Sequence, residues 1–188
     1  SLMTLLRHTV MPNLVQTMEG QPALIHAGPF GNIAHGCNSV LADRMALAYT
    51  DFVITEAGFG SDLGFEKFID IKIRQSGLLP SAAVLVASVR ALKWHGGVAR
   101  RALEKPDPAA VRAGAPNLEH HIALIQSFGL PVVVAINQFH SDTPEEIQEV
   151  AQIASAAGAQ AAVKCCGFSQ GGEGGAALAE AVARIAVE

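Results

Sequence analysis

Five short apolar runs, separated by segments with helical signals, constrain the fold of this chain more than any other feature. Each run is continuous rather than alternating, which is typical of strands that are covered on both faces. The runs are Ala23–Ala27, Phe52–Glu56, Ala83–Ser88, Val132–Ile136 and Gln160–Lys164. This β–α alternation predicts an α/β fold with an open, mostly parallel sheet, flanking helices and right-handed crossovers.

The segment after the fourth run has the clearest helix signals. Thr143 can cap a helix, Pro144 suits its first turn, and Glu146 completes a capping box. A glycine, Gly158, stands where such a helix would end. The sequence therefore predicts a helix over Thr143–Gly158.

The other connections give weaker signals. Helices are expected at Leu5–Met18, with a break at its proline, and at Asn32–Ala48. Phe65–Ile73 fits either an exposed strand or one face of a helix, and we favour the helix because a capping signal precedes it. Gly96–Asn117 is rich in proline, alanine and charge without a clean period, so we expect a long, mobile connection.

The composition excludes several classes of protein. Half of the residues (50%) are hydrophobic, which is incompatible with intrinsic disorder, and the apolar runs are too short to span a bilayer, which takes about 20 residues. A net charge of −4 argues against nucleic-acid binding. Only 16% of residues are charged, below the usual share of about 25%, so we expect part of the surface to meet other protein, in an oligomer or in a longer chain.

The 188 residues suit a single domain, which we expect over residues 3–188, with Ser1 and Leu2 as an expression scar. Three cysteines, of which Cys165 and Cys166 are adjacent, do not make a disulfide framework and indicate a reducing compartment. The N-terminus has no secretory signal pattern.

Candidate functional residues follow the apolar runs, because ligands of open α/β sheets bind at the carboxyl ends of the strands. Gly28–Ser39, after the first run, is either a loop that approaches an anionic ligand or a tight turn with a cap. Glu56 ends the second run before a glycine loop, which suits a magnesium or phosphate site or a solvated loop. Arg90 and Lys93, after the third run, lie three residues apart on one helical face, where they could bind phosphate, pair with carboxylates or be plain surface.

The fourth and fifth runs end in polar and glycine-rich segments. Asn137, Gln138 and Phe139 suit recognition of a ring, although a phenylalanine is more often core. Gly167–Gly175 is either a flexible linker or a loop held against a ligand. The sequence contains no Gly-x-x-x-x-Gly-Lys-[Ser/Thr] phosphate loop, no zinc-binding spacing and no Gly-x-Ser-x-Gly motif of a serine hydrolase.

Several long sequence strings, found in a fixed order, indicate a particular protein family. From about Thr9 to Gly175 the chain resembles the formate–tetrahydrofolate ligase family. The strings are PNLVQTMEGQPALIHAGPF (Pro12–Phe30), GPFGNIAHGCNSV (Gly28–Val40), TEAGFGSDLGFEKF (Thr55–Phe68), VASVRALKWHGG (Val86–Gly97) and VVVAINQFHSDT (Val132–Thr143).

The resemblance implies a reaction and its cofactors. Members of this family join formate to N10 of tetrahydrofolate with ATP and Mg²⁺, through formyl phosphate, and a monovalent cation assists. They are cytoplasmic, commonly homo-oligomeric, and built on a nucleotide-binding fold related to phosphate-loop NTPases. The family's chain is several hundred residues longer, with its phosphate loop upstream, so the resemblance implies a central segment that is inactive alone and works with the remainder of the ligase chain.

The resemblance also implies site residues. Phe139 is similar to the family's pterin-stacking aromatic, and His140 and Phe168 complete the expected folate site, although the family usually has Pro and Trp at these two positions. The residues themselves, taken with this chemistry, add two catalytic candidates: Glu56 could hold Mg²⁺ or a bound water, and His35 or His140 could assist proton removal from the amine. The nucleotide and phosphate side is expected at Asn137, Arg90, Lys93, Gly171 and Gly172.

Two other functions remain open. A short paralogue could keep a folate or nucleotide pocket without catalysis. A dinucleotide-binding oxidoreductase would share the sheet class, but Gly58-Phe59-Gly60 lacks the third glycine of the Gly-x-Gly-x-x-Gly motif.

Overall fold

A computed structural model of the chain describes residues 1–26 and 37–187. The chain divides into two compact units, Ser1–Leu79 and Pro80–Glu188, which we describe separately. Within the described residues, no helix is long and apolar enough to cross a membrane.

The first unit begins with a short helix, α1 (Leu2–Leu6), and a hairpin of β1 (Asn13–Gln16) and β2 (Pro22–Ile25). The two strands are antiparallel, so the predicted helix at Leu5–Met18 and the predicted parallel strand at Ala23–Ala27 are both wrong. The turn decides the pairing, because Gly20 has a φ of +85° and its N–H donates to the carbonyl of Thr17.

The run Phe52–Glu56 is not a strand. Its Ile54 side chain is 94% exposed, and the segment pairs with no strand of the described chain. A strand exists only where a neighbour accepts its backbone hydrogen bonds, and an apolar pattern alone does not supply that neighbour.

The helix favoured at Phe65–Ile73 is confirmed. It is built from the π-helical segments η1 (Ser61–Phe65) and η2 (Phe68–Ile73), followed by α3 (Arg74–Ser76). In the same unit lies α2 (Val40–Leu47), which confirms the later part of the helix predicted at Asn32–Ala48. The predicted start is wrong, because Cys37–Ser39 are not helical and Ser39 caps the helix: its hydroxyl accepts the N–H of Ala42 at 3.1 Å.

The second unit holds the predicted parallel sheet, with three strands in place of five. Its strands are β3 (Ala83–Ala87), β4 (Val132–Asn137) and β5 (Ala161–Cys165), in the order β3-β4-β5. Both pairings are parallel. The central strand is buried from Val132 to Ile136, as a continuous apolar run predicts.

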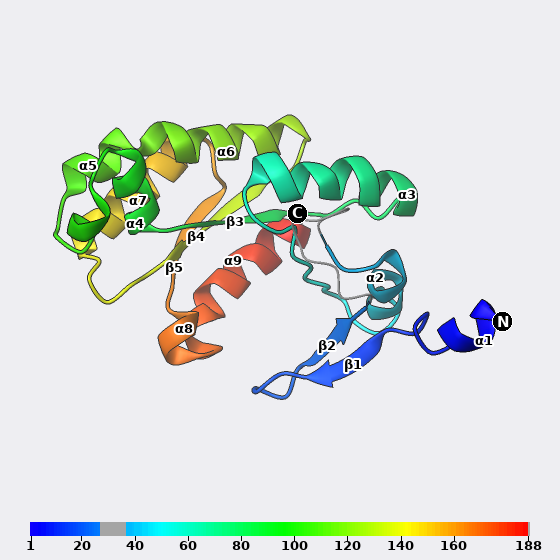
Figure 1. Cartoon of the computed structure of the whole chain (residues 1–188). Helices are drawn as coiled ribbons and strands as arrows, with labels where there is room; N and C mark the ends of the chain where they lie inside the picture. The colour runs from blue at the N-terminus through cyan, green and yellow to red at the C-terminus, as the bar shows by residue number, and fades with distance from the viewer. Residues whose placement is uncertain (27–36, 188) are drawn as a thin grey trace. The chain divides into compact units, whose positions relative to one another are not determined.

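Helices cover both faces of this sheet (Figure 1). On one side α6 (Ala115–Ser127) and α7 (Pro144–Ala156) pack on the strands, and on the other α9 (Ala176–Val187) packs on β4 and β5. Short elements join them: α4 (Val89–His95), η3 (Arg100–Ala102), α5 (Pro108–Ala113), α8 (Gly167–Gln170) and η4 (Glu173–Gly175). The α/β class with a parallel sheet and flanking helices is confirmed.

The segment Gly96–Asn117 is not the structureless connection that we expected. It contains η3, α5 and the start of α6, and α5 packs against α4. Glycines permit this close approach: a Cβ on Gly96 would lie 2.1 Å from the carbonyl oxygen of Ala110, and one on Gly114 would lie 2.0 Å from that of Leu92. Alanine-rich helices have little periodic contrast, which hid them from the pattern.

The capping box of α7 is confirmed. The Thr143 hydroxyl accepts the N–H of Glu146 at 3.3 Å, and the Glu146 carboxylate accepts the N–H of Thr143 at 3.0 Å. Gly158 follows the helix with a φ of +88°, as a helix-ending glycine should.

Candidate functional site

The carboxyl ends of the three parallel strands form one edge of the second unit. Ala87 is in register with Ile136, and Asn137 with Cys165, so the loops that follow the strands begin side by side. In open α/β sheets this edge is where ligands bind. Every site residue that we predicted after position 80 lies in these loops, at the last residue of β4, in α4 or in the short helix α8.

The loop after β4 is a closed turn. The Asp142 carboxylate accepts the N–H of Phe139 at 2.8 Å, and the carbonyl of Phe139 accepts the N–H of Asp142 at 3.1 Å. Asp142 is buried, and this burial raises the pKa of its carboxyl, although the hydrogen bond from Phe139 opposes the shift. Within the turn, Phe139 is half-buried and His140 is exposed.

Arg90 joins this turn to α4. Its guanidinium carbon lies 4.3 Å from the centroid of the Phe139 ring, a cation–π distance. One guanidinium nitrogen, Nη2, lies 3.4 Å from the Ser141 hydroxyl and 3.2 Å from a carboxylate oxygen of Glu104. Arg90 therefore contacts a carboxylate, one of the alternatives that its spacing left open.

Lys93 lies in the interior. Its ammonium donates to Oε1 of Glu146 at 2.8 Å and to the carbonyl of Lys105 at 3.1 Å, and neither charged side chain is exposed. Burial alone would raise the pKa of Glu146, but the hydrogen bonds from Lys93, Thr143 and Asp107 together lower it. Lys93 therefore pairs with a carboxylate, one of the alternatives that its spacing left open. We do not assign it a phosphate contact, because its ammonium is buried.

The glycine-rich loop after β5 is folded rather than a linker. The N–H of Cys166 donates to the carbonyl of Gly174 at 3.0 Å, and a Cβ on Gly174 would come within 2.6 Å of the Cys166 carbonyl oxygen. Gly171 has a φ of +60°. Phe168, on α8, is 100% exposed, so its ring is not packed on Phe139.

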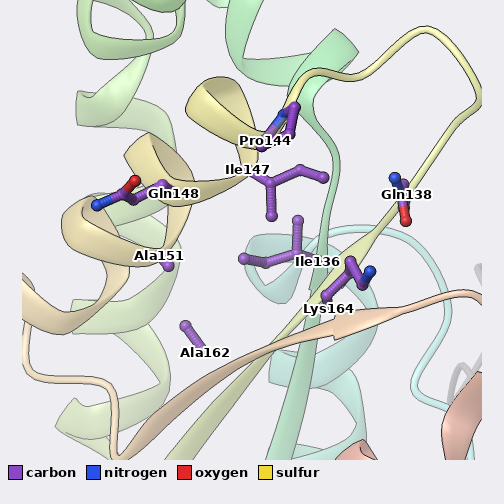
Figure 2. Close-up of a pocket in the computed structure, with 8 residues that line it drawn as sticks. All are labelled: Ile136, Gln138, Pro144, Ile147, Gln148, Ala151, Ala162 and Lys164. Atoms are coloured by element: carbon purple, nitrogen blue, oxygen red, sulfur yellow. The ribbon is translucent and has the colours of Figure 1, made fainter.

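A hollow of about 340 Å³ lies beneath α7 at the same edge (Figure 2). Its floor is apolar, and Ile136 of β4 and Ile147 of α7 point toward one another across it. Gln138 and Lys164 supply polar groups at its rim. The side-chain oxygen of Gln138, Oε1, accepts a hydrogen bond from the Cys166 thiol at 3.0 Å, which links the loops after β4 and β5.

The first unit has a hollow of its own, of about 820 Å³, and Glu56 is among its lining residues. Asp43 and Cys37 also line it, and Asp43 pairs with the buried ammonium of Lys72. Burial raises the pKa of the Cys37 thiol. Glu56 itself is exposed.

His35 falls outside the described residues, as do Gly28 to Gly36 of the first candidate loop. On either side of these residues, the N–H of His26 donates to the side-chain oxygen of Asn38 at 3.0 Å, and the Asn38 amide donates to the carbonyl of Leu24 at 2.6 Å. In the part of the chain that the structure describes, no three His, Cys, Asp or Glu side chains gather as a metal site.

Comparison with known proteins identifies the family. The family profile described as formate–tetrahydrofolate ligase matches residues 1–188. The chain belongs to the formate–tetrahydrofolate ligase family. It is similar to a formate–tetrahydrofolate ligase of Paracoccus denitrificans, with 57% identity over 186 residues, which are 99% of this chain and 33% of that protein. A ligase of Sphingobium sp. is 57% identical over 182 residues (97% and 32%), and one of Allorhizobium ampelinum is 54% identical over 186 residues (99% and 33%).

This chain spans about a third of the length of the curated ligases that it matches. The structure adds two residues to the candidate site that the sequence analysis did not place there. Asp142 closes the Phe139 turn, and Glu146 neutralises Lys93. Asp142 lies within the string VVVAINQFHSDT, but only the fold shows that its carboxylate turns back onto the Phe139 backbone.

Proposed function

We propose that this chain supplies the folate side, and part of the nucleotide side, of an enzyme that ligates formate to tetrahydrofolate to give 10-formyltetrahydrofolate. The observation that carries the proposal is the family match over all 188 residues, and the place of Phe139 just after β4, at the carboxyl edge of the sheet, supports it. ATP, formate and tetrahydrofolate are the substrates of this proposal.

The folate side centres on Phe139. Its ring is half-buried, with Arg90 over it, so it remains partly accessible to a flat ring such as a pterin. Offset stacking of two aromatic rings contributes about 0.5–1.5 kcal/mol beyond their burial. Phe168 and His140 are exposed and follow neighbouring strands, which supports a folate site that Phe168 completes when the substrate binds.

The nucleotide side draws on Asn137, Gly171 and Gly172. Asn137 is the last residue of β4, and the two glycines lie in the loop after β5, the neighbouring strand. Backbone N–H groups in a glycine loop can approach phosphate oxygens closely. The sequence has no phosphate loop, so we assign the main phosphate contacts to the remainder of the ligase chain.

Glu56 is the proposed ligand of Mg²⁺. The ion usually takes one or two protein carboxylates and completes its shell with phosphates and water, which a single exposed carboxylate fits. When bound, Mg²⁺ would neutralise charge on the transferred phosphoryl group. Asp43 lines the same hollow, but its carboxylate already pairs with the ammonium of Lys72.

The proposed chemistry has two steps. A formate oxygen attacks the γ-phosphorus of ATP, ADP leaves, and formyl phosphate forms. N10 of tetrahydrofolate then attacks the formyl carbon, inorganic phosphate leaves, and the amine loses a proton. Negative charge collects on phosphate oxygens in both steps, so cations and aimed N–H groups stabilise the transition states. His35 and His140 are the proposed proton acceptors in this chain.

Exposed apolar side chains of the first unit support further protein contacts. Met18 is fully exposed, and Tyr49 and Ile54 are 80% and 94% exposed. Tyr49 and Ile54 line the same hollow of this unit, and contiguous exposed apolar patches mark protein interfaces. We propose that the remainder of the ligase chain and a second copy of the enzyme cover this surface.

The test is calorimetric titration of the 188-residue chain with tetrahydrofolate, with and without ATP. We expect binding to the parent chain and a roughly tenfold weaker affinity for Phe139→Ala. Phe128→Ala is the matched control, because Phe128 is also half-buried but precedes β4, at the opposite edge of the sheet. Equal losses in both variants, or an unchanged affinity in Phe139→Ala, would contradict the folate site.

Activity is measured in parallel as phosphate release with ATP, formate and tetrahydrofolate. We expect none from the 188-residue chain. Turnover at the rate of a complete ligase would overturn the assignment of the phosphate contacts to other residues.

A further inference from the structure

We propose that Arg90 is a positioning residue of the folate site. Its guanidinium lies over one face of the Phe139 ring, fixes the plane of the ring and leaves the other face for the substrate. The inference rests on the proposed function, since it assumes that Phe139 stacks on the folate ring. It gives Arg90 a role other than the phosphate contact that its sequence position indicates.

The first argument is the contact itself. The guanidinium carbon lies 4.3 Å from the centroid of the Phe139 ring, which places the cation over the ring face. A guanidinium is flat, so it can stack on an aromatic face, and its positive charge is also attracted by the quadrupole of the ring. With Arg90 on one face, the half-buried ring can accept a second flat group only on the other face or at its edge.

The second argument is that Arg90 also contacts the same turn through its hydrogen bonds. Its Nη2 lies 3.4 Å from the Ser141 hydroxyl, two residues beyond Phe139. One side chain from α4 therefore holds the ring at one end of the turn and the hydroxyl at the other. Asp142 closes the turn from within, by accepting the N–H of Phe139.

The third argument is that Arg90 is itself held in place. Ser88 caps α4 by accepting the N–H of Ala91 at 3.3 Å, which fixes the first turn of the helix, where Arg90 lies. Glu104 pairs with the same Nη2 at 3.2 Å. The Nε of Arg90 is buried and has no hydrogen-bond partner among the described residues.

A phosphate ligand would need different surroundings. The Arg90 side chain is 29% exposed, and its Nη2 is already shared between the carboxylate of Glu104 and the hydroxyl of Ser141. A carboxylate beside a guanidinium competes with an anionic ligand for the same charge. The geometry therefore favours an aromatic and turn-holding role.

The experiment compares Arg90→Met, Arg90→Lys and Arg112→Met in the 188-residue chain labelled with 4-fluorophenylalanine. Arg112→Met is the matched control, because Arg112 also pairs with a glutamate, Glu149, and its guanidinium is otherwise largely exposed. The ¹⁹F resonance of Phe139 is assigned by its loss in Phe139→Leu. Tetrahydrofolate and ATP affinities are measured by calorimetry on the same proteins.

We expect Arg90→Met to move the Phe139 resonance and to weaken tetrahydrofolate binding roughly three- to tenfold. Arg90→Lys should recover part of both effects, because it keeps the charge without the flat group, and Arg112→Met should leave both unchanged. ATP affinity should be the same in all of these proteins.

An unmoved Phe139 resonance in Arg90→Met, or a moved resonance with unchanged tetrahydrofolate affinity, would overturn the positioning role while the folate site stands. A loss of ATP affinity in Arg90→Met would support the phosphate role instead. Absence of tetrahydrofolate binding to the parent chain would overturn the proposed function, and with it this inference.

Discussion

The ammonium of Lys93 lies 2.8 Å from Oε1 of Glu146, and neither side chain is exposed to solvent. The same carboxylate accepts the N–H of Asp107 at 2.9 Å and, through its other oxygen, that of Thr143. One buried ion pair therefore ties α4, the segment before α5 and the start of α7 together, next to the proposed folate site.

Removal of one partner of this pair should destabilise the chain strongly. Lys93→Met leaves a buried carboxylate without its cation, and we expect the free energy of unfolding to fall by about 3–5 kcal/mol. Denaturant unfolding measures the change.

The double variant Lys93→Met/Glu146→Leu should recover much of this loss, because two apolar side chains need no compensation. Strict additivity of the two single changes would show that the pair does not act as a unit.

The same pair predicts a dependence of stability on pH. The folded-state pKa of Glu146 lies below its ordinary value of 4.5, so its contribution is fully present above pH 4.5 and is lost as the pH falls through the folded-state pKa. Glu146→Gln should remove this loss, which amounts to at most about 1.4 kcal/mol per pH unit.

The control for the pH series is Glu145→Gln, an exposed neighbour on the same helix. Burial raises the pKa of Asp142, so its contribution has the opposite sign. The charge of Glu146 adds to this rise, so the comparison with Glu146→Gln includes a smaller change at Asp142, and the one with Glu145→Gln does not. The free energy of unfolding is measured at each pH from 7 to 3. If it changes by the same amount in the parent and in Glu146→Gln, the pH dependence does not come from Glu146.

The contact between α4 and α5 should not tolerate a side chain at Gly114. A Cβ there would lie 2.0 Å from the carbonyl oxygen of Leu92, so Gly114→Ala must separate the helices, at about 1–3 kcal/mol. Gly175→Ala is the control, since no heavy atom of the described residues lies within 4 Å of its Cβ position. Urea midpoints that are equal in both variants would mean that the helices move apart freely.

Phe168→Trp should strengthen tetrahydrofolate binding roughly two- to fivefold, because the larger indole offers more stacking area. The parent Phe168 side chain is fully exposed, so the substitution meets no neighbour among the described residues of the free protein. Phe168→Leu, which keeps an apolar group without a flat ring, should weaken binding. Calorimetry compares the three, and an affinity that ignores this position would exclude Phe168 from the folate site.

Local sequence signals were sufficient where the structure depends on near neighbours. Thr143 and Glu146 share one helical turn, so their capping box could be predicted from spacing alone. The apolar run at Val132–Ile136 is the buried central strand that its pattern predicted. Phe139 was identified as a ring-binding candidate because it follows this strand and matches a family string.

Tertiary structure decided what depends on distant partners. The apolar runs at Ala23–Ala27 and Phe52–Glu56 resemble the other runs in sequence. The first nevertheless pairs in an antiparallel hairpin, and the second pairs with no described strand. The reason is that pairing depends on which backbone segment lies alongside. Arg90 and Lys93 are three residues apart and indistinguishable by pattern, but one covers the Phe139 ring and the other is buried against Glu146, 53 residues away. The sequence by itself determined the α/β class and the family, and it predicted the loops that we propose for ligand binding. The packing of α4 against α7 and against the β4 turn decided what Arg90 and Lys93 contact, because the role of a buried charge depends on the partner that the fold brings to it.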